Sequence, residues 1–297
     1  MSRPPSDAAA GAPAGRLSAK AELLQYGLQP KRTLGQNFLL DQSLCEKIAK
    51  LTGPEGGSLL EIGAGLGALT AAALGRGQRV VAIETDPALL PVLREKFAAA
   101  LASGQLQLLH ADVREVELRS VLLELPAPRT LAGNLPYHLS GLLLRRAVEL
   151  ADVVQRSVFL LQLEVVERLC AEPGTPAYGA LTVFARSVYA PRRSFVVRRG
   201  AFYPQPGVDS AVVVLEPLDP PRLPPSDEFA LLVKAAFGKR RKTLRNAWRG
   251  IFELSMPELE ELAQKAEISL DARGETLGVG DFERMSELSR GRQTGGR

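Results

Sequence analysis

Residues 58–67 read Ser-Leu-Leu-Glu-Ile-Gly-Ala-Gly-Leu-Gly, and this stretch decides the fold. The mostly apolar run at residues 58–62 predicts a buried strand. Gly63, Gly65 and Gly67 then allow the backbone to turn from that strand into a helix, and they allow a ligand to approach the backbone closely. A strand, a glycine turn and a helix in this order are typical of the first unit of an α/β fold.

Strands and helices continue to alternate after this unit, and polar residues follow the ends of several strands. The alternation predicts a doubly wound, mostly parallel sheet. Further strands are expected at residues 79–83, 106–109, 130–132, 157–161 and 210–215, with an extended segment at 187–197 that Pro191 breaks. Helices are expected at residues 19–26, from Asp41 or Ser43 to 51, and at 68–74, 87–101 with Pro87 in the first position, 142–150 and 164–170.

A change of composition divides the chain into regions. Residues 1–16 are rich in Pro, Ala, Gly and Ser and lack the apolar core of a secretory signal, so we expect a disordered tail; a transit peptide is the less favoured alternative. Residues 17–216 form the α/β domain, and the proline-rich residues 217–225 form a linker. Residues 226–297 are expected to form a small all-α domain. Its helices are predicted at 227–237, 242–252, 256–266 and 280–289, with Ser255 and Asp281 as caps.

Composition excludes several classes of protein. The 297 residues hold 37 Lys and Arg against 33 Asp and Glu, a net charge of +4 that permits a polyanionic partner without requiring one. No apolar run reaches the roughly 18 residues that a membrane span needs. Cys45 and Cys170 are far apart and form no metal-binding pattern, so we expect no metal site and no disulfide. These features predict a cytoplasmic protein without a membrane partner, and nothing indicates more than a monomer.

A second motif stands where the fourth strand ends, at residues 133–137, which read Gly-Asn-Leu-Pro-Tyr. The side-chain oxygen of Asn134 and the carbonyl of Leu135 can both accept hydrogen bonds from one amino group, and Tyr137 can stack on a flat ring. The alternative is a proline turn capped by Asn134, with Tyr137 covering the core.

The glycine turn and the acids after the strands indicate an adenosine-containing cofactor. With Ala68 in the last position, the turn satisfies the G-x-G-x-x-[G/A] dinucleotide fingerprint, and Glu84 stands about 20 residues on, where a ribose-binding carboxylate belongs. Three features favour S-adenosylmethionine over NAD. Glu61 suits a cation better than a pyrophosphate, Asp112 can accept from an adenine amino group, and no hydride-transfer acid or base is evident. Asp112 alone is equally compatible with a helix cap or a solvated turn.

Together these motifs resemble the KsgA/RsmA family of small-subunit rRNA adenine dimethyltransferases, from about Leu34 to Asn246. The resemblance rests on many short matches in the same order. They are residues 35–39 (GQNFL), 61–67 (EIGAGLG), 134–137 (NLPY), 162–165 (QLEV), 173–174 (PG), 178–179 (YG), 202–211 (FYPQPGVDSA) and 237–246 (FGKRRKTLRN). One position departs from the family pattern: Leu163 stands where the family usually has Lys, which would remove one RNA contact.

The resemblance implies a class I, Rossmann-like methyltransferase that uses S-adenosylmethionine. Its expected reaction is dimethylation at N6 of two adjacent adenosines near the 3′ end of small-subunit (16S) rRNA, coupled to small-subunit biogenesis. The residues expected to line the cofactor site are Asn37, Leu39, Gly63, Glu84, Asp112 and Asn134. Those expected to hold the target adenine are Asn134, Leu135 and Tyr137, with Phe202 on its other face.

Clustered basic residues fit an RNA substrate. Residues 239–249 hold six Lys and Arg without an acid, and Arg240, Arg241, Lys242 and Arg245 are the predicted RNA contacts. Arg192, Arg193, Arg198 and Arg199 form a second group. The alternative is a solvated helix face.

Three other functions are alternatives to this one. They are methylation of adenine in large-subunit rRNA by the related family, a non-catalytic role as an RNA-binding assembly or transcription factor, and, more remotely, an NAD oxidoreductase.

Overall fold

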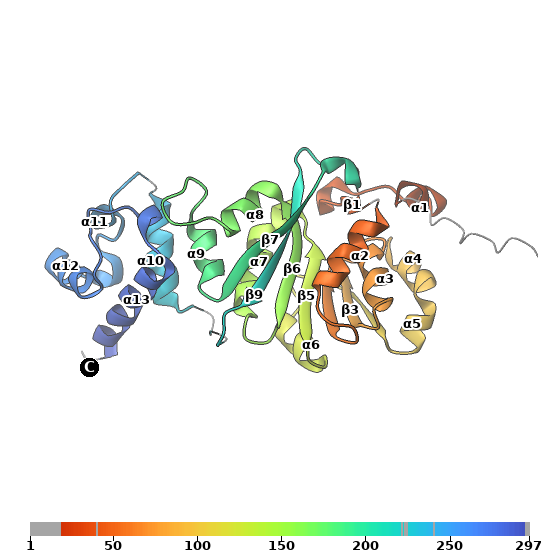
Figure 1. Ribbon diagram of the computed structural model, residues 1–297, viewed down its shortest axis with the longest axis horizontal. Helices are drawn as coiled ribbons and strands as arrows, with labels where there is room; N and C mark the ends of the chain where they lie inside the picture. The colour runs from red at the N-terminus through yellow and green to blue at the C-terminus, as the bar shows by residue number, and fades with distance from the viewer. Residues whose placement is uncertain (1–18, 40, 221, 223–224, 240, 295–297) are drawn as a thin grey trace, which may run out of the picture.

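The computed structural model describes residues 19–39, 41–220, 222, 225–239 and 241–294 (Figure 1). The predicted tail at residues 1–16 and the predicted RNA contact Arg240 lie outside these residues. Within them, no helix combines the length and the apolar character that crossing a membrane requires.

A seven-stranded sheet forms the centre of the described chain, in the order β4-β3-β2-β5-β6-β9-β7. The first five strands in this order are parallel, and β9 runs antiparallel to both of its neighbours. The predicted doubly wound, mostly parallel sheet is therefore confirmed. The strands are β2 (Ser58–Ile62), β3 (Arg79–Glu84), β4 (Leu106–His110), β5 (Arg129–Asn134), β6 (Arg156–Gln162), β7 (Tyr189–Val197) and β9 (Ser210–Pro217).

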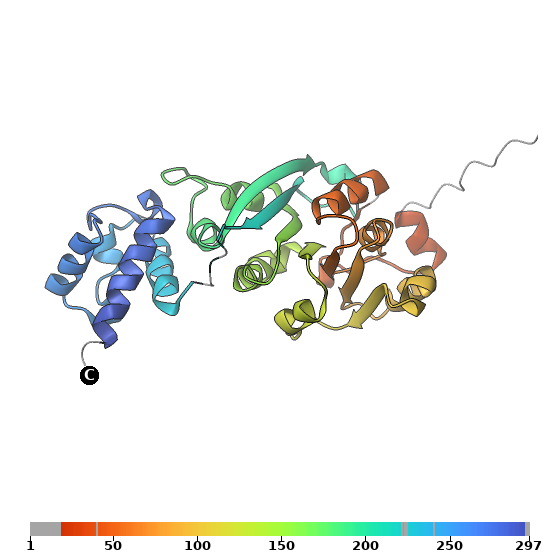
Figure 2. The same ribbon diagram turned by 60° about the horizontal axis from the view of Figure 1, so that its bottom comes forward.

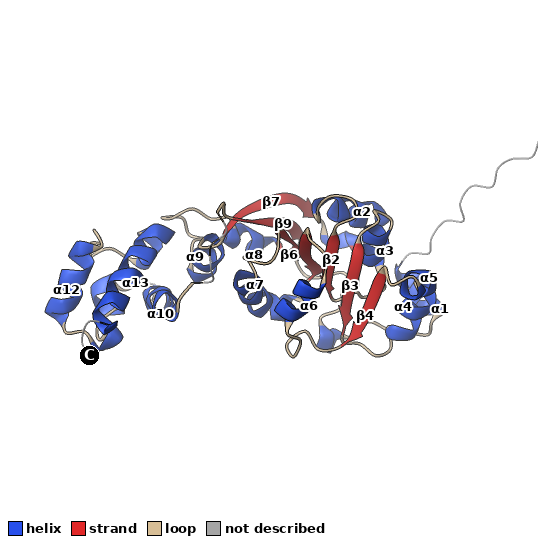
Figure 3. Ribbon diagram, turned by 90° about the horizontal axis from the view of Figure 1, so that it is seen from below, coloured by secondary structure: helices blue, strands red, loops and turns tan. Residues whose placement is uncertain are grey.

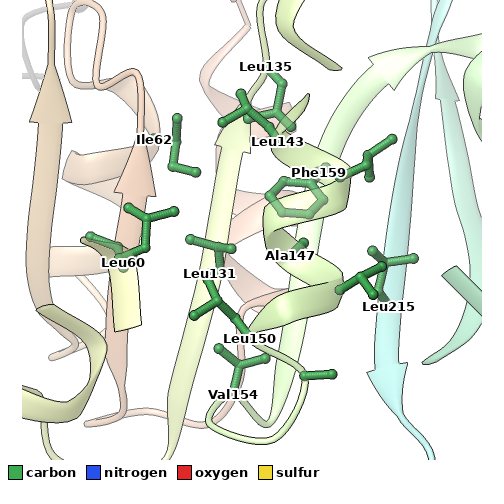
Figure 4. Close-up of a cluster of buried hydrophobic side chains, with 14 of the residues drawn as sticks. Leu60, Ile62, Leu131, Leu135, Leu143, Ala147, Leu150, Val154, Phe159 and Leu215 are labelled. Atoms are coloured by element: carbon green, nitrogen blue, oxygen red, sulfur yellow. The ribbon is translucent and has the colours of Figure 1, made fainter. Parts of the chain in front are cut away.

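Helices cover both faces of the sheet because successive side chains of a buried strand point to opposite faces. Leu60 and Phe159 contribute to one apolar cluster (Figure 4), and their neighbours Leu59 and Val158 contribute to the other. Figure 3 shows α2 and α3 on one side of the strands and α6 and α7 on the other. The first face carries α2 (Gln42–Leu51), α3 (Ala68–Leu74), α4 (Leu90–Lys96) and α5 (Ala98–Ala102); the second carries α6 (Leu118–Glu124), α7 (Ser140–Glu149), α8 (Leu163–Leu169) and α9 (Ala180–Arg186).

The predicted helix at residues 87–101 was wrong in its start and in its continuity. Pro87 lies in a turn, because the Asp86 carboxylate accepts the amide of Ala88 at 3.0 Å and the Asp86 carbonyl accepts the amide of Leu89 at 3.1 Å. The helix α4 therefore begins only at Leu90. Phe97 leaves the helical conformation (φ −115°, ψ 24°) and separates α4 from α5.

Of the extended segment expected at 187–197, residues 189–197 form the strand β7, and Pro191 does not break it. Pro191 pairs in register with Leu215, and the irregularity lies between Arg193 and Phe195 instead. The strand tolerates proline because β7 is at the edge of the sheet, where one row of amide groups needs no partner strand.

A short two-stranded ribbon lies beside the main sheet and was not predicted. It joins β1 (Phe38–Leu39) to β8 (Phe202–Tyr203) in antiparallel register. The helix α1 (Ala19–Gln25) precedes it and agrees with the helix expected there. The ribbon brings the loop before α2 against the segment before β9.

The carboxyl-terminal helices lie at one end of the molecule, beyond α9 (Figures 1 and 2). They are α10 (Asp227–Gly238), α11 (Leu244–Ala247), α12 (Met256–Lys265) and α13 (Val279–Thr294). Their core includes Trp248 and Phe282, and it also takes in Tyr178 and Val183 from the α9 region. The division into domains at residues 217–225 stays a prediction.

Two details of these helices differ from the prediction and one agrees with it. The helix expected at 242–252 is shorter: α11 begins after the extended Thr243 (φ −68°, ψ 160°) and ends at Ala247, and Gly250 and Phe252 have left-handed conformations (φ 72° and 54°). Ser255 caps α12 in a capping box with Glu258, as expected. Asp281 lies inside the first turn of α13 and not before it, and its carboxylate accepts the amide of Gly278 at 2.8 Å.

Candidate active site

A cavity of about 330 Å³ opens at the carboxyl ends of the parallel strands. Its position is the one where open α/β sheets hold ligands, because the chain runs outward in both directions from β2 and β5. Its lining includes eight of the predicted site residues: Asn37, Leu39, Gly63, Glu84, Asp112, Asn134, Leu135 and Tyr137. The volume is within the range of about 300–1,000 Å³ typical of small-molecule sites.

The glycine turn forms one wall of this cavity. Gly63, Gly65 and Gly67 all have positive φ angles, of 75°, 58° and 76°, which side-chain-bearing residues rarely adopt. A Cβ atom on Gly67 would lie 2.4 Å from the Phe97 ring, whereas one on Gly63 would meet no atom within 4 Å. The turn therefore packs closely against α4–α5 and leaves open space above Gly63.

Glu84 joins the end of β3 to the glycine turn. Its two carboxylate oxygens accept the amides of Gly65 and Asp86, each at 2.8 Å. Burial raises the pKa of this carboxyl above its ordinary value, although the two amides oppose the rise. Each oxygen keeps a second lone pair, so the carboxylate can still accept from a pair of sugar hydroxyls.

Glu61 lines the cavity and is buried, with 2% of its surface exposed. Its Oε2 atom accepts a hydrogen bond from the Thr70 hydroxyl at 2.5 Å. Burial, with a smaller contribution from Glu84, raises the pKa of Glu61 to about 8. The side chain is therefore mostly protonated at pH 7 in the protein alone, and a cationic group beside it would favour its ionised form.

Asp112 follows β4 and lies in an ion pair at the mouth of the cavity. Arg114 donates from Nε to both carboxylate oxygens at 3.0 Å and from Nη2 to Oδ2 at 2.6 Å. The Arg114 amide also donates to Oδ1 at 2.9 Å. These contacts lower the pKa of Asp112. Three N–H groups of Arg114 therefore bind the carboxylate, and an adenine amino group donating to Asp112 would compete with them.

The loop at residues 31–37 forms the outer wall and is held by a buried acid that the sequence analysis did not single out. Asp86 accepts Lys31 Nζ at 2.6 Å and Gln36 Nε2 at 2.8 Å. Burial by itself would raise the pKa of Asp86, but these donors outweigh it and the pKa is lowered. The sequence signal for this contact was weak, because Asp86 follows a strand but Lys31 and Gln36 are more than 45 residues before it.

The Asn134 side chain is oriented by the same loop. Its Nδ2 atom donates to the carbonyl of Asn37 at 2.8 Å, and because only the NH2 end can donate, the side-chain oxygen is left as an acceptor. In the described part of the chain, no donor is recorded to that oxygen or to the Leu135 carbonyl. Gly133 sits so close to β2 that a Cβ atom there would lie 2.4 Å from the Ile62 carbonyl oxygen.

Tyr137 and Phe202 occupy different environments. Tyr137 lines the cavity, is partly buried and shares a hydrogen bond of 2.8 Å with Ser210, a residue not predicted to take part in the site. Phe202 is outside the cavity lining; its ring is 3% exposed and packs in the core, opposite Leu39 in the two-stranded ribbon. A stacking role for Phe202 would require this ring to leave its present packing, and it stays a prediction.

Some of the predicted RNA contacts are in ion pairs with acidic side chains, and others are not. Arg241 and Lys242 are exposed, and the described residues give neither an ion pair. Arg245 is paired with both Glu260 and Asp271. In the second basic group, Arg198 donates to Asp209 at 2.7 Å. Exposed ion pairs of this kind contribute little to stability, about 0–1 kcal/mol, so they can be exchanged for a phosphate at small cost.

Two solved structures have a fold similar to that of this chain. A dimethyladenosine transferase from Plasmodium falciparum superposes with a TM-score of 0.71 at 22% identity, covering 84% of this chain and 95% of that one. The 23S rRNA methyltransferase ErmE superposes with a TM-score of 0.62 at 23% identity, covering 86% of this chain and 100% of that one. At these identities the similarity establishes the fold, a Rossmann-like methyltransferase sheet.

Sequence comparison gives closer relatives. The chain is 39% identical over 265 residues to ribosomal RNA small subunit methyltransferase A of Geobacter metallireducens, which covers 88% of this chain and 95% of that protein. It is 41% identical over 266 residues to the protein of the same name from Xanthomonas oryzae pv. oryzae, over 89% and 97% of the two chains. The family model described as ribosomal RNA adenine dimethylase matches residues 27–288. The chain therefore belongs to the ribosomal RNA adenine dimethylase family.

Proposed function

We propose that this protein dimethylates N6 of two adjacent adenosines near the 3′ end of small-subunit rRNA, as part of small-subunit biogenesis. Membership of the adenine dimethylase family and the names of its relatives support the reaction and the substrate. Its partner would then be the small ribosomal subunit, and it would act on that subunit in the cytoplasm, as a monomer.

S-adenosylmethionine is the cofactor of this family, and it supplies an electrophilic methyl group bound to a sulfonium centre. The volume of the cavity and the polar groups in its lining support binding of this cofactor. The space above Gly63 admits a ligand against the backbone, and Glu84 offers acceptors for ribose hydroxyls. Glu61 and Asp112 offer carboxyl groups for a cationic centre and for an amino group. We assign Asn37, Leu39, Gly63, Glu84, Asp112 and Asn134 to this cofactor.

One observation carries the proposed chemistry: the hydrogen bond from Asn134 Nδ2 to the Asn37 carbonyl. The lone pair of an adenine N6 is delocalised into the ring, which makes N6 a poor nucleophile. The Asn134 side-chain oxygen and the Leu135 carbonyl would accept hydrogen bonds from the two N–H groups of N6. These bonds localise the lone pair on the nitrogen and orient it. Because the amide is fixed beforehand, the residues act by positioning, which can lower a barrier by about 7–11 kcal/mol at most.

Stacking would hold the target base in place. An adenine must leave its neighbours to enter the cavity, which costs a few kcal/mol. Contact with an aromatic ring recovers about 1–3 kcal/mol per base, and Tyr137 lines the cavity next to the two acceptors. We assign Asn134, Leu135, Tyr137 and Phe202 to the target adenine.

The test uses radiolabelled S-adenosylmethionine and two substrates, small and large ribosomal subunits that lack the corresponding methylation. The labelled RNA is digested to nucleosides and the products are identified. Dimethyladenosine in the small subunit alone is the expected result. Label in the large subunit alone would assign the chain to the reaction of the ErmE-type enzymes. Cofactor binding without label in either RNA would indicate that the protein is a non-catalytic binding factor with a methyltransferase fold.

A further inference from the structure

Ser210 contacts the proposed adenine site through its hydroxyl. It begins β9, whereas Tyr137 follows β5, and β6 lies between these two strands. The Ser210 Oγ atom lies 2.8 Å from the hydroxyl of Tyr137. Ser210 is fully buried, with 0% of its surface exposed, whereas Tyr137 is only partly buried and lines the cavity. The bond therefore joins a side chain at the site to one in the core.

Ser210 is a rigid point of attachment because its backbone is held on both sides. It begins β9 and pairs with Gln162 of β6 and with Val197 of β7. The residue before it is fixed as well. The Asp209 carboxylate accepts the amide of Arg199 at 2.9 Å, and the Asp209 carbonyl accepts the amide of Leu163 at 3.0 Å.

Tyr137, in contrast, belongs to a short connection and not to a strand. It starts the 3-10 turn Tyr137–Leu139, between the end of β5 and the start of α7. The hydroxyl bond to Ser210 is the side-chain hydrogen bond that the structure gives to Tyr137. Rotation about χ1 moves the whole ring and its hydroxyl, so a bond at the hydroxyl fixes where the ring lies, while the packing around the ring sets its plane.

We propose that Ser210 is a positioning residue that holds the Tyr137 ring at the place where it stacks on the target adenine. This inference rests on the proposed function, in which Tyr137 holds that base. Ser210 does not touch the base or the cofactor. Its effect passes entirely through the Tyr137 hydroxyl, so the two residues form one functional unit.

The test is a double-mutant cycle with Ser210→Ala, Tyr137→Phe and the combined variant, assayed on methylation-deficient small subunits. Each single change removes the same hydrogen bond. A hydrogen bond of this kind is worth about a two- to tenfold change in an equilibrium or rate. We expect each single variant to lose that factor in kcat, with KM for the subunit and the Kd for S-adenosylmethionine within twofold of wild type. The combined variant should be no slower than either single variant.

Two control variants separate this effect from a general loss of packing. Ser187→Ala removes a buried hydroxyl that donates to the Phe184 carbonyl at 2.8 Å, and Tyr189→Phe removes one that donates to Ala147 at 2.7 Å. Both lie away from the cavity, so kcat should stay at the wild-type value.

Three outcomes would overturn the inference. One is a Ser210→Ala variant with wild-type kcat. Another is a Ser210→Ala effect of equal size in the wild-type and Tyr137→Phe backgrounds, because the two residues would then act independently. A wild-type protein that makes no dimethyladenosine would overturn the proposed function itself, and the positioning role with it.

Discussion

At the scale of single residues, the Asn134 amide has a divided role. Its NH2 end is used by the Asn37 carbonyl, and its oxygen end is left as an acceptor toward the cavity. An aspartate at this position could accept but could not bond to Asn37, and a leucine could do neither. This explains why an amide, and not a carboxylate, suits the site.

Asn134→Ala should therefore lower turnover strongly and leave the protein folded. Loss of a preorganised group that acts on the reacting atoms typically costs about 10²–10³ in kcat. Loss of the bond to Asn37 should lower the free energy of unfolding by only about 0.5–1.5 kcal/mol. Methylation kinetics and urea denaturation measure the two effects. Gln105→Ala is a matched control, since that amide donates to the Leu74 and Gln78 carbonyls at the far end of the sheet. Near-normal turnover by Asn134→Ala would refute the assigned role.

Glu61 should make stability depend on pH. Its folded-state pKa of about 8 is above the ordinary value of 4.5, so the folded protein binds the proton more tightly than the unfolded chain does. The contribution of Glu61 is therefore fully present below pH 4.5 and is lost as the pH rises through about 8. The loss has a slope of at most about 1.4 kcal/mol per pH unit.

Glu61→Gln keeps an acceptor for Thr70 and removes the titration. Urea denaturation between pH 5 and 8.5 should show the wild type losing stability relative to this variant as the pH rises. If the free energy of unfolding depended on pH in the same way in both proteins, Glu61 would not be a buried carboxyl group with a raised pKa.

At the scale of helices and strands, long buried runs were predictable and short contacts were not. The strands β2, β5, β6 and β9 consist mainly of buried apolar residues, which is a strong local signal. The ribbon between β1 and β8 has two residues in each strand and joins distant parts of the chain, so no local pattern reveals it. The start of α4 depends on the Asp86 side chain, which competes with the helix for the Ala88 amide.

The candidate site was predictable to a similar degree and for similar reasons. Residues within strand-end motifs, such as Gly63, Glu84 and Asn134, do line one cavity. The contacts among side chains could not be foreseen. Asp112 is occupied by Arg114, and Tyr137 is bonded to Ser210, because folding decides which side chains meet.

The contact between β2 and β5 gives a prediction about these elements. Gly133→Ala would place a Cβ atom 2.4 Å from the Ile62 carbonyl oxygen, and backbone cannot yield as a flexible side chain does. We expect a loss of about 1–3 kcal/mol in the free energy of unfolding, as for other overpacked cores.

Gly141→Ala in α7 is the control, because its Cβ meets no atom within 4 Å. Since alanine favours helix over glycine by up to about 1 kcal/mol, this variant should be as stable as wild type or more so. Equal stabilities of the two variants, measured by chemical denaturation, would contradict the close approach.

At the scale of the whole molecule, the cavity and the exposed basic residues lie in different parts of the structure. The cavity lies in the sheet, and the exposed basic residues Arg241 and Lys242 lie among the carboxyl-terminal helices. Those helices share an apolar core with the α9 region, which includes Tyr178 and Val183. A cut within residues 217–225 would therefore divide that core as well as the sequence.

Neutralising Arg241 and Lys242 should change how RNA binding depends on salt. Each phosphate contact adds about 0.7–0.9 to the slope of log K against log salt concentration, so Arg241→Gln with Lys242→Gln should flatten the slope by about 1–2. Lys265→Gln is the control, because Lys265 is paired with Glu261 at 2.8 Å. Binding of the wild type and the variants to small subunits over a range of salt concentrations measures the slopes. An unchanged slope in the double variant would argue against phosphate contacts there.

The position of β9 has a consequence for the order in which the protein can form during its own synthesis. β9 is the last strand in the chain, yet it lies between β6 and β7 inside the sheet. Until residues 210–217 have been translated and have left the exit tunnel, β6 is an open edge and β7 has no neighbour. Tyr137 also lacks its partner until then. The nascent chain can assemble the half of the sheet around the glycine turn early, but the half that contains β6, β9 and β7 must wait until β9 has been made and has emerged.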